Sequence, residues 1–173
     1  TMTILVYLCG TDLESRSQMA TSDLQEMLNA DLSKKVNLIV YSGGCKKWQN
    51  NVLSSSTNQI WQVKDEGLVC LNDDVGSVSM VKPGTLADFI EYGAERFPAN
   101  RMALIFWDHG GGSVSGFGYD EKYASSGSMD LAEIDRALTD GGVKFDFVGF
   151  DACLMATAET ALMLSDHADY MIA

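Results

Sequence analysis

Two residues of this sequence have side chains suited to acyl transfer, and each follows an apolar run. Cys153 ends the stretch 144–153, and His109 comes just after the run 102–107. A thiolate is a strong nucleophile, and an imidazole beside it can remove the thiol proton and later return one to a leaving amine. The sequence therefore predicts a thiol–imidazole pair, provided that the fold brings the two runs together.

The elements that carry these side chains favour such an arrangement. Residues 102–107 and 145–150 are continuous apolar runs, which is typical of parallel strands covered on both faces. Ligands bind outside the carboxyl ends of such strands, so we expect His109 and Cys153 to project from the same edge of the sheet. A helix predicted from about residue 156 to 165 would favour the thiolate through its N-terminal amides. Glycines 110–112 give the backbone the freedom to direct amide N–H groups at an oxyanion; the alternative is that His109 is only an exposed loop residue.

The remaining chain alternates between strand-like and helix-like patterns. Strands are predicted at 3–8 and 36–41 with a helix at about 17–30 between them, which makes a right-handed βαβ unit. Asp12, Ser22 and Asp23 are possible caps of this helix. Region 48–78 is richer in Asn, Ser and Asp, and its short runs 59–63 and 68–71 predict a small β-hairpin inserted on the rim. Further helices are predicted at 85–97 and about 130–138, and a last strand at 170–173. This alternation indicates a doubly wound α/β fold.

Composition limits the functions that the chain can have. A length of 173 residues with 46% hydrophobic content suits one domain with a sizeable core. The net charge of −12 argues against nucleic acid or an anionic membrane as the partner and fits a cationic substrate better. No membrane-spanning run and no signal peptide occur in these residues, so they do not reveal the localisation. The four cysteines form no C-x-x-C pair and the histidines number two, so a zinc site is not expected.

The other thiols and the second imidazole are weaker candidates for the same chemistry. His167 follows a predicted helix that returns the chain to the opposite edge of the sheet, and we expect it to be a helix-end residue. Cys9 ends the first strand, but Gly10 and Thr11 beside it supply no base. We interpret Cys9 as structural, and Cys45 and Cys70 as packing residues or free thiols.

Three short motifs carry a resemblance to a known family. Residues 7–14 (YLCGTDLE), 108–112 (DHGGG) and 151–156 (DACLMA) resemble the clostripain family of cysteine peptidases, which are relatives of caspases, legumains and gingipains. The separation of His109 and Cys153 is also close to the roughly 50 residues found in caspases.

The resemblance implies a caspase-like three-layer α-β-α sandwich with a mainly parallel central sheet. Residues 1–173 would form a single catalytic domain equivalent to a large subunit, with the hairpin region at about 48–78. The chain stops within a predicted strand, so we expect a C-terminal remainder, or a second polypeptide, to complete the sheet. The implied activity is endopeptidase cleavage after Arg or Lys, with His109 and Cys153 as a catalytic dyad, a thioester acyl-enzyme, and the backbone N–H groups of Gly110 and Cys153 as the oxyanion hole.

Two aspartates beside the dyad have alternative roles. Asp151, two residues before the nucleophile, would place a carboxylate in the pocket for the residue that precedes the cut and would pair with a guanidinium or an ammonium. Alternatively, it orients the loop by accepting backbone N–H bonds. Asp108 would orient the imidazole or have a structural role, and the structural role is favoured because adjacent strand residues face opposite ways.

Members of the family are commonly secreted bacterial zymogens, which implies a secreted, cell-surface or periplasmic protein here. They cut themselves at a basic residue between the histidine and the cysteine, and Lys122 is the candidate. The chemistry needs no cofactor, but the resemblance also implies calcium dependence. The acidic cluster Asp65, Glu66, Asp73 and Asp74 would be its site, unless it is simply a solvated run of charge.

Two other functions compete with this hypothesis. His109–Gly112 matches the HGGG oxyanion motif of lipases, which would indicate an esterase of the α/β-hydrolase type, but the chain contains no G-x-S-x-G motif. The other alternative is a non-catalytic relative that binds basic peptides through the same acidic pocket.

Overall fold

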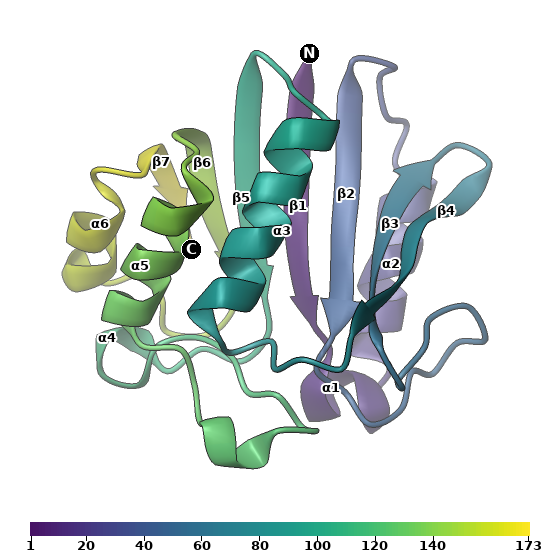
Figure 1. Cartoon of the computed structure of the whole chain (residues 1–173), viewed down its shortest axis with the longest axis horizontal. Helices are drawn as coiled ribbons and strands as arrows, with labels where there is room; N and C mark the ends of the chain where they lie inside the picture. Colours follow the sequence, from purple (N-terminus) through teal and green to yellow (C-terminus); the bar gives the residue numbers. More distant parts are fainter.

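The computed structural model describes all of residues 1–173, which fold into one seven-stranded sheet with helices on both faces (Figure 1). The strands are β1 (Met2–Cys9), β2 (Val36–Gly43), β3 (Asn58–Lys64), β4 (Gly67–Gly76), β5 (Arg101–Trp107), β6 (Phe145–Asp151) and β7 (Ala168–Ile172). The helices are α1 (Thr11–Ser15), α2 (Met19–Asn29), α3 (Pro83–Arg96), α4 (Gly112–Ser115), α5 (Leu131–Gly141) and α6 (Ala158–Leu164).

The sheet has the order β4-β3-β2-β1-β5-β6-β7, and strands β1, β2, β5, β6 and β7 are parallel. The carboxyl ends of these parallel strands meet at one edge, the lower edge in Figure 1. The expected three-layer, mainly parallel α/β fold is thus confirmed. The predicted hairpin is also present, but it is part of the central sheet, because β3 pairs antiparallel with β2 and β4 forms the outer strand.

The core lies on both faces of the sheet because the parallel strands alternate two sets of apolar side chains. One set, which includes Tyr7, Tyr41 and Phe106, packs against α3 and α5. The other set, which includes Leu8 and Trp107, packs against α2. No helix of the protein is both long and apolar enough to cross a membrane.

Loop 110–130 between β5 and α5 is closed at its base by a pair of backbone bridges. Phe117 and Met129 exchange two N–H···O hydrogen bonds of 2.8 Å, and both side chains are completely buried. Phe117 also bridges to Gly110, next to the histidine. The Phe117–Met129 pair therefore anchors the loop to the core, and Lys122 lies in the segment between these two residues.

Candidate active site

The structure places His109 and Cys153 together at the carboxyl edge of the sheet. His109 lies two residues beyond the end of β5, and Cys153 lies two residues beyond the end of the neighbouring strand β6. Both residues are exposed, and both line one cavity of about 350 Å³. Their expected proximity is confirmed, whereas their catalytic roles stay a prediction.

The loops that carry the two residues are in direct contact through Gly110. A Cβ atom added to Gly110 would lie 2.0 Å from the carbonyl oxygen of Cys153 and 3.0 Å from the Met155 side chain. Only glycine therefore fits at this position without moving the loop that carries Cys153. The amide N–H groups of Gly110 and Cys153 donate no hydrogen bond within the chain, so both are available to an oxyanion.

The turn after Cys153 differs from its prediction. Helix α6 begins at Ala158, where Thr157 caps it by accepting the Thr160 N–H at 3.1 Å. Between the thiol and this helix the chain turns through Leu154, which has a left-handed φ of 64°. Helix α6 thus begins two residues later than predicted, and stabilisation of the thiolate by its N-terminus stays a prediction.

The imidazole of His109 has a partner that sequence reasoning missed. Its Nε2 atom lies 2.9 Å from Oδ1 of Asp12, a residue of the short helix α1 just after β1. This hydrogen bond is the main reason why the pKa of Asp12 falls below its ordinary value. In the sequence Asp12 belonged to the motif 7–14 and had the pattern of a helix cap, but neither feature connected it to His109. Its position beyond the first strand, at the same sheet edge, was the available signal.

Asp108 has the structural role that strand geometry favoured. Its buried carboxylate accepts the backbone N–H of His109 at 2.5 Å and that of Tyr119 at 2.7 Å, and it makes no hydrogen bond to the imidazole. Burial raises the pKa of Asp108 to about 7. This residue therefore fixes the backbone around the histidine.

Asp151 lines the cavity together with a second carboxylate, that of Asp23 on α2. The Asp151 carboxylate accepts no hydrogen bond, so it does not orient the loop in the way that Asp108 does. Partial burial, and next the charge of Asp23, raise the pKa of Asp151. Trp107 donates its indole N–H to Asp23 at 2.6 Å and thereby holds this second carboxylate in place. Asp23 was also missed, because a helix-cap pattern explained it equally well.

The weaker candidates lie apart from this cavity. His167 precedes β7 at the opposite edge, as expected, and its Nε2 contacts Asp135 at 2.6 Å. Cys9 and Cys45 are buried, whereas Cys70 is exposed on β4. Lys122 is half-buried: its Nζ donates to the Ser55 carbonyl at 2.7 Å, and its backbone N–H donates to Asp120 at 2.9 Å.

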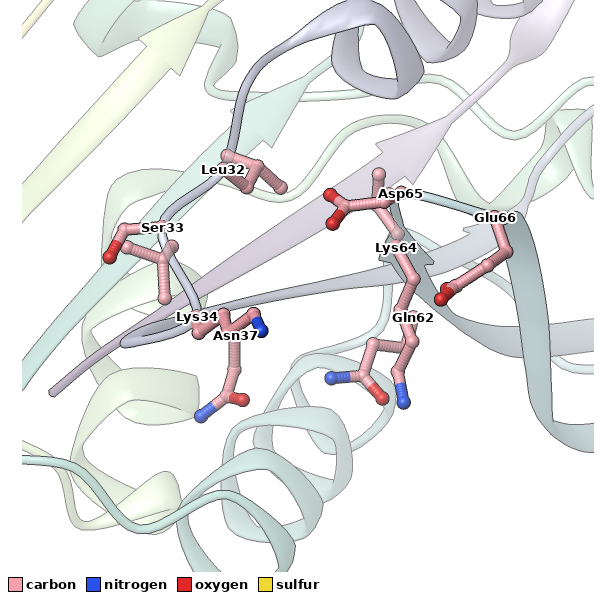
Figure 2. A pocket seen from close by; sticks show the side chains of 10 residues that line it. Leu32, Ser33, Lys34, Asn37, Gln62, Lys64, Asp65 and Glu66 are labelled. Carbon is pink, nitrogen blue, oxygen red and sulfur yellow. The ribbon is translucent and has the colours of Figure 1, made fainter.

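The acidic cluster proposed for calcium does not converge. Asp65 and Glu66 form the β3–β4 turn, whereas Asp73 and Asp74 lie roughly 20 Å further along β4. No group of three potential metal ligands occurs in the structure. Figure 2 shows a different hollow, of about 320 Å³, where the β3–β4 turn faces the segment before β2. Lys34, Lys64, Asp65 and Glu66 line it, so it offers mixed charge but no nucleophile and no imidazole.

The sheet order, with an exposed thiol and an imidazole at the ends of neighbouring parallel strands, agrees with the caspase-like class of folds expected from the sequence. Within this class the chain belongs to the clostripain family, whose model matches residues 6–173. No curated protein matches the chain.

Solved structures with the same fold are C11 cysteine proteases. A secreted C11 protease from Bacteroides thetaiotaomicron, in complex with an irreversible peptide inhibitor, is 25% identical, with a TM-score of 0.75 over 98% of this chain and 47% of that protein. An inactive zymogen from Parabacteroides distasonis is 24% identical, with a TM-score of 0.73 over 98% of this chain and 47% of that protein. The chain thus spans about half the length of these relatives.

Proposed function

We propose that the protein is a cysteine endopeptidase that cuts peptide bonds after Arg or Lys. The observation that carries this proposal is the convergence of exposed Cys153 and His109 on one cavity that also holds the Asp151 carboxylate. Membership of the clostripain family and the likeness to C11 proteases support it.

The site suits a mechanism that needs no cofactor. The Cys153 thiolate attacks the scissile carbonyl carbon, and the amides of Gly110 and Cys153 bind the resulting oxyanion. As the C–N bond breaks, the protonated His109 gives its proton to the leaving amine, and a thioester remains on the sulfur. A water molecule, deprotonated by His109, then hydrolyses this thioester and restores the thiol.

The preference for a basic residue is supported by the paired carboxylates of Asp151 and Asp23. Two like charges in one cavity repel each other, and a guanidinium or ammonium group between them would relieve this repulsion. A neutral side chain would leave the repulsion in place. The aliphatic part of a Lys or Arg side chain would contact Leu13, Met19 and Phe150, which line the same cavity.

The proposal includes a continuation of the sheet beyond β7 by a further part of the protein or by a second polypeptide. β7 forms the outer edge of the sheet. Its Tyr170 and Ile172 lie on the same face of the sheet as α2, but α2 does not extend to them, and they are 72% and 59% exposed. Exposed apolar edge strands of this kind are normally covered. By analogy with a secreted C11 protease we also propose that the protein is exported. The cut of a zymogen after Lys122, expected from the sequence, remains part of this proposal.

One labelling experiment tests the central proposal. The protein, expressed from its complete gene, is treated with peptides that carry a thiol-reactive group after Lys, Arg or norleucine. We expect rapid labelling at Cys153 with the two basic probes and none in Cys153→Ala. Labelling at another cysteine, or equal rates with the neutral norleucine probe, would contradict the assignment.

The role of Asp151 is tested with substrates of the same three kinds. Asp151→Asn should lower kcat/KM at least tenfold more for the lysyl and arginyl peptides than for the norleucine peptide, because it removes one of the paired charges. Equal losses would assign Asp151 a structural role. Binding of basic peptides without any turnover would instead indicate the non-catalytic alternative.

A further inference from the structure

We propose that Asp12 positions the His109 imidazole through Nε2, so that Nδ1 is the nitrogen that exchanges protons with the Cys153 thiol and the leaving amine. The site would then be a Cys–His–Asp triad in place of the expected dyad. This inference rests on the proposed peptidase function.

The first argument is the hydrogen bond itself. The Asp12 carboxylate lies 2.9 Å from Nε2, and no other side chain bonds to the ring. An ionised carboxylate can only accept, so the proton of this bond belongs to Nε2 in both the neutral and the charged imidazole. In the neutral ring Nδ1 therefore carries the free lone pair and is the base. The low pKa of Asp12 is consistent with a carboxylate that stays ionised.

The second argument is that buried neighbours hold α1 in place although the Asp12 side chain is partly exposed. Two residues after Asp12, the carboxylate of Glu14 is fully buried and accepts the backbone N–H of Thr21 at 2.8 Å and that of Gln49 at 2.6 Å. Thr11, directly before Asp12, has a φ of 48°, which is rare for a β-branched residue. Such strained backbone tends to occur where function requires a fixed geometry.

Charged or titratable side chains near the imidazole lie on α1, on α2 and at the ends of β5 and β6. Arg16 of α1 lies 4.0 Å from the other carboxylate oxygen of Asp12 and is highly exposed. Asp108 lies beneath the His109 backbone, and Asp23, Asp151 and Cys153 share the cavity. Among these groups Asp12 alone forms a hydrogen bond with the ring, so its removal is the specific perturbation.

Kinetics of the protein expressed from its complete gene give the first test. Asp12→Ala should lower kcat for a lysyl peptide by about 10²-fold at nearly constant KM, which is typical for impaired acid–base catalysis. Asp12→Asn keeps an acceptor for Nε2–H but loses the charge, so we expect partial rescue, to about a tenfold loss. In both variants the alkaline limb of the kcat/KM profile should move to lower pH, because the imidazolium loses its counter-charge. The control Arg16→Ala should stay within about twofold of the wild type.

The second test observes the tautomer directly and does not depend on activity. With only two histidines, a ¹⁵N spectrum of the Cys153→Ala protein separates the ring signals of His109 and His167. We expect the neutral His109 ring to be protonated at Nε2 and to become a mixture of tautomers in Asp12→Ala. Asp135→Ala is the matched control, since Asp135 contacts Nε2 of His167 in the same way and should change only that signal.

The outcomes separate this inference from the proposed function. An unchanged His109 spectrum in Asp12→Ala, or losses of kcat without movement of the alkaline limb, would overturn the role of Asp12. Full turnover in Cys153→Ala or in His109→Ala would overturn the peptidase proposal itself.

Discussion

Replacing Gly110 by alanine tests the contact between the histidine loop and the cysteine loop. The added Cβ would lie 2.0 Å from the Cys153 carbonyl oxygen, and since real Cβ contacts essentially never fall below 3.0 Å, the two loops must separate by about 1 Å. Both proposed oxyanion donors lie in these loops. A displacement of this size typically costs about 10²-fold in rate, and loss of one oxyanion donor costs about 10²- to 10³-fold.

The assay compares kcat/KM for a lysyl peptide in wild type, Gly110→Ala and Gly84→Ala. Gly84 lies near the start of α3, where an added Cβ meets no atom within 4 Å, so this variant controls for the substitution itself. We expect a loss of at least about 10²-fold in Gly110→Ala and none in Gly84→Ala. Far-UV circular dichroism and alkylation of Cys153 by iodoacetamide show whether the fold and the thiol persist. A Gly110→Ala protein that keeps its rate within about threefold would refute the reasoning.

Three further predictions follow from the surrounding residues. Asp23→Asn keeps an acceptor for Trp107 but removes a charge, so kcat/KM should fall about tenfold for basic peptides and hardly change for norleucine peptides; equal losses would contradict the paired-carboxylate model. Burial raises the pKa of Asp108 to about 7, above the value near 3.9 expected in the unfolded chain. Between these pH values the folded protein holds a proton that the unfolded chain has lost, so this group lowers the free energy of unfolding as the pH rises. In urea titrations the free energy of unfolding of the wild type, relative to that of Asp108→Asn, should therefore fall by about 3 kcal/mol between pH 5 and pH 8. An unchanged difference would mean that Asp108 is ionised throughout. Lys122→Ala should abolish self-cleavage of the loop on a denaturing gel, whereas Lys46→Ala should not; persistent cleavage would place the processing site elsewhere.

The sequence predicted the positions of His109 and Cys153 because these positions depend on local signals. Continuous apolar runs identify buried parallel strands, and the carboxyl ends of such strands share an edge, so His109 and Cys153 could be placed without further information. The start of α6 was missed because Leu154 adopts a left-handed conformation that its residue type does not indicate.

Asp12 and Asp23 were missed for a different reason. Each lies near the start of a helix, where a carboxylate is already explained as a cap. Their contacts with His109 and Trp107 join residues 97 and 84 positions apart. Only the packing of α1 and α2 against the sheet brings these pairs together. In the same way, no local pattern revealed that β3 would pair with β2.

The buried pair of Phe117 and Met129 would determine the state of the protein if the proposed cut after Lys122 occurs. These two residues lie on either side of Lys122, and their backbone bonds and buried side chains join the two ends of the loop. A cut after Lys122 would leave His109 on one fragment and Cys153 on the other, yet this junction and the β5–β6 pairing would still hold the fragments together. The cut protein would therefore migrate as two bands under denaturing conditions and elute as one particle in native buffer.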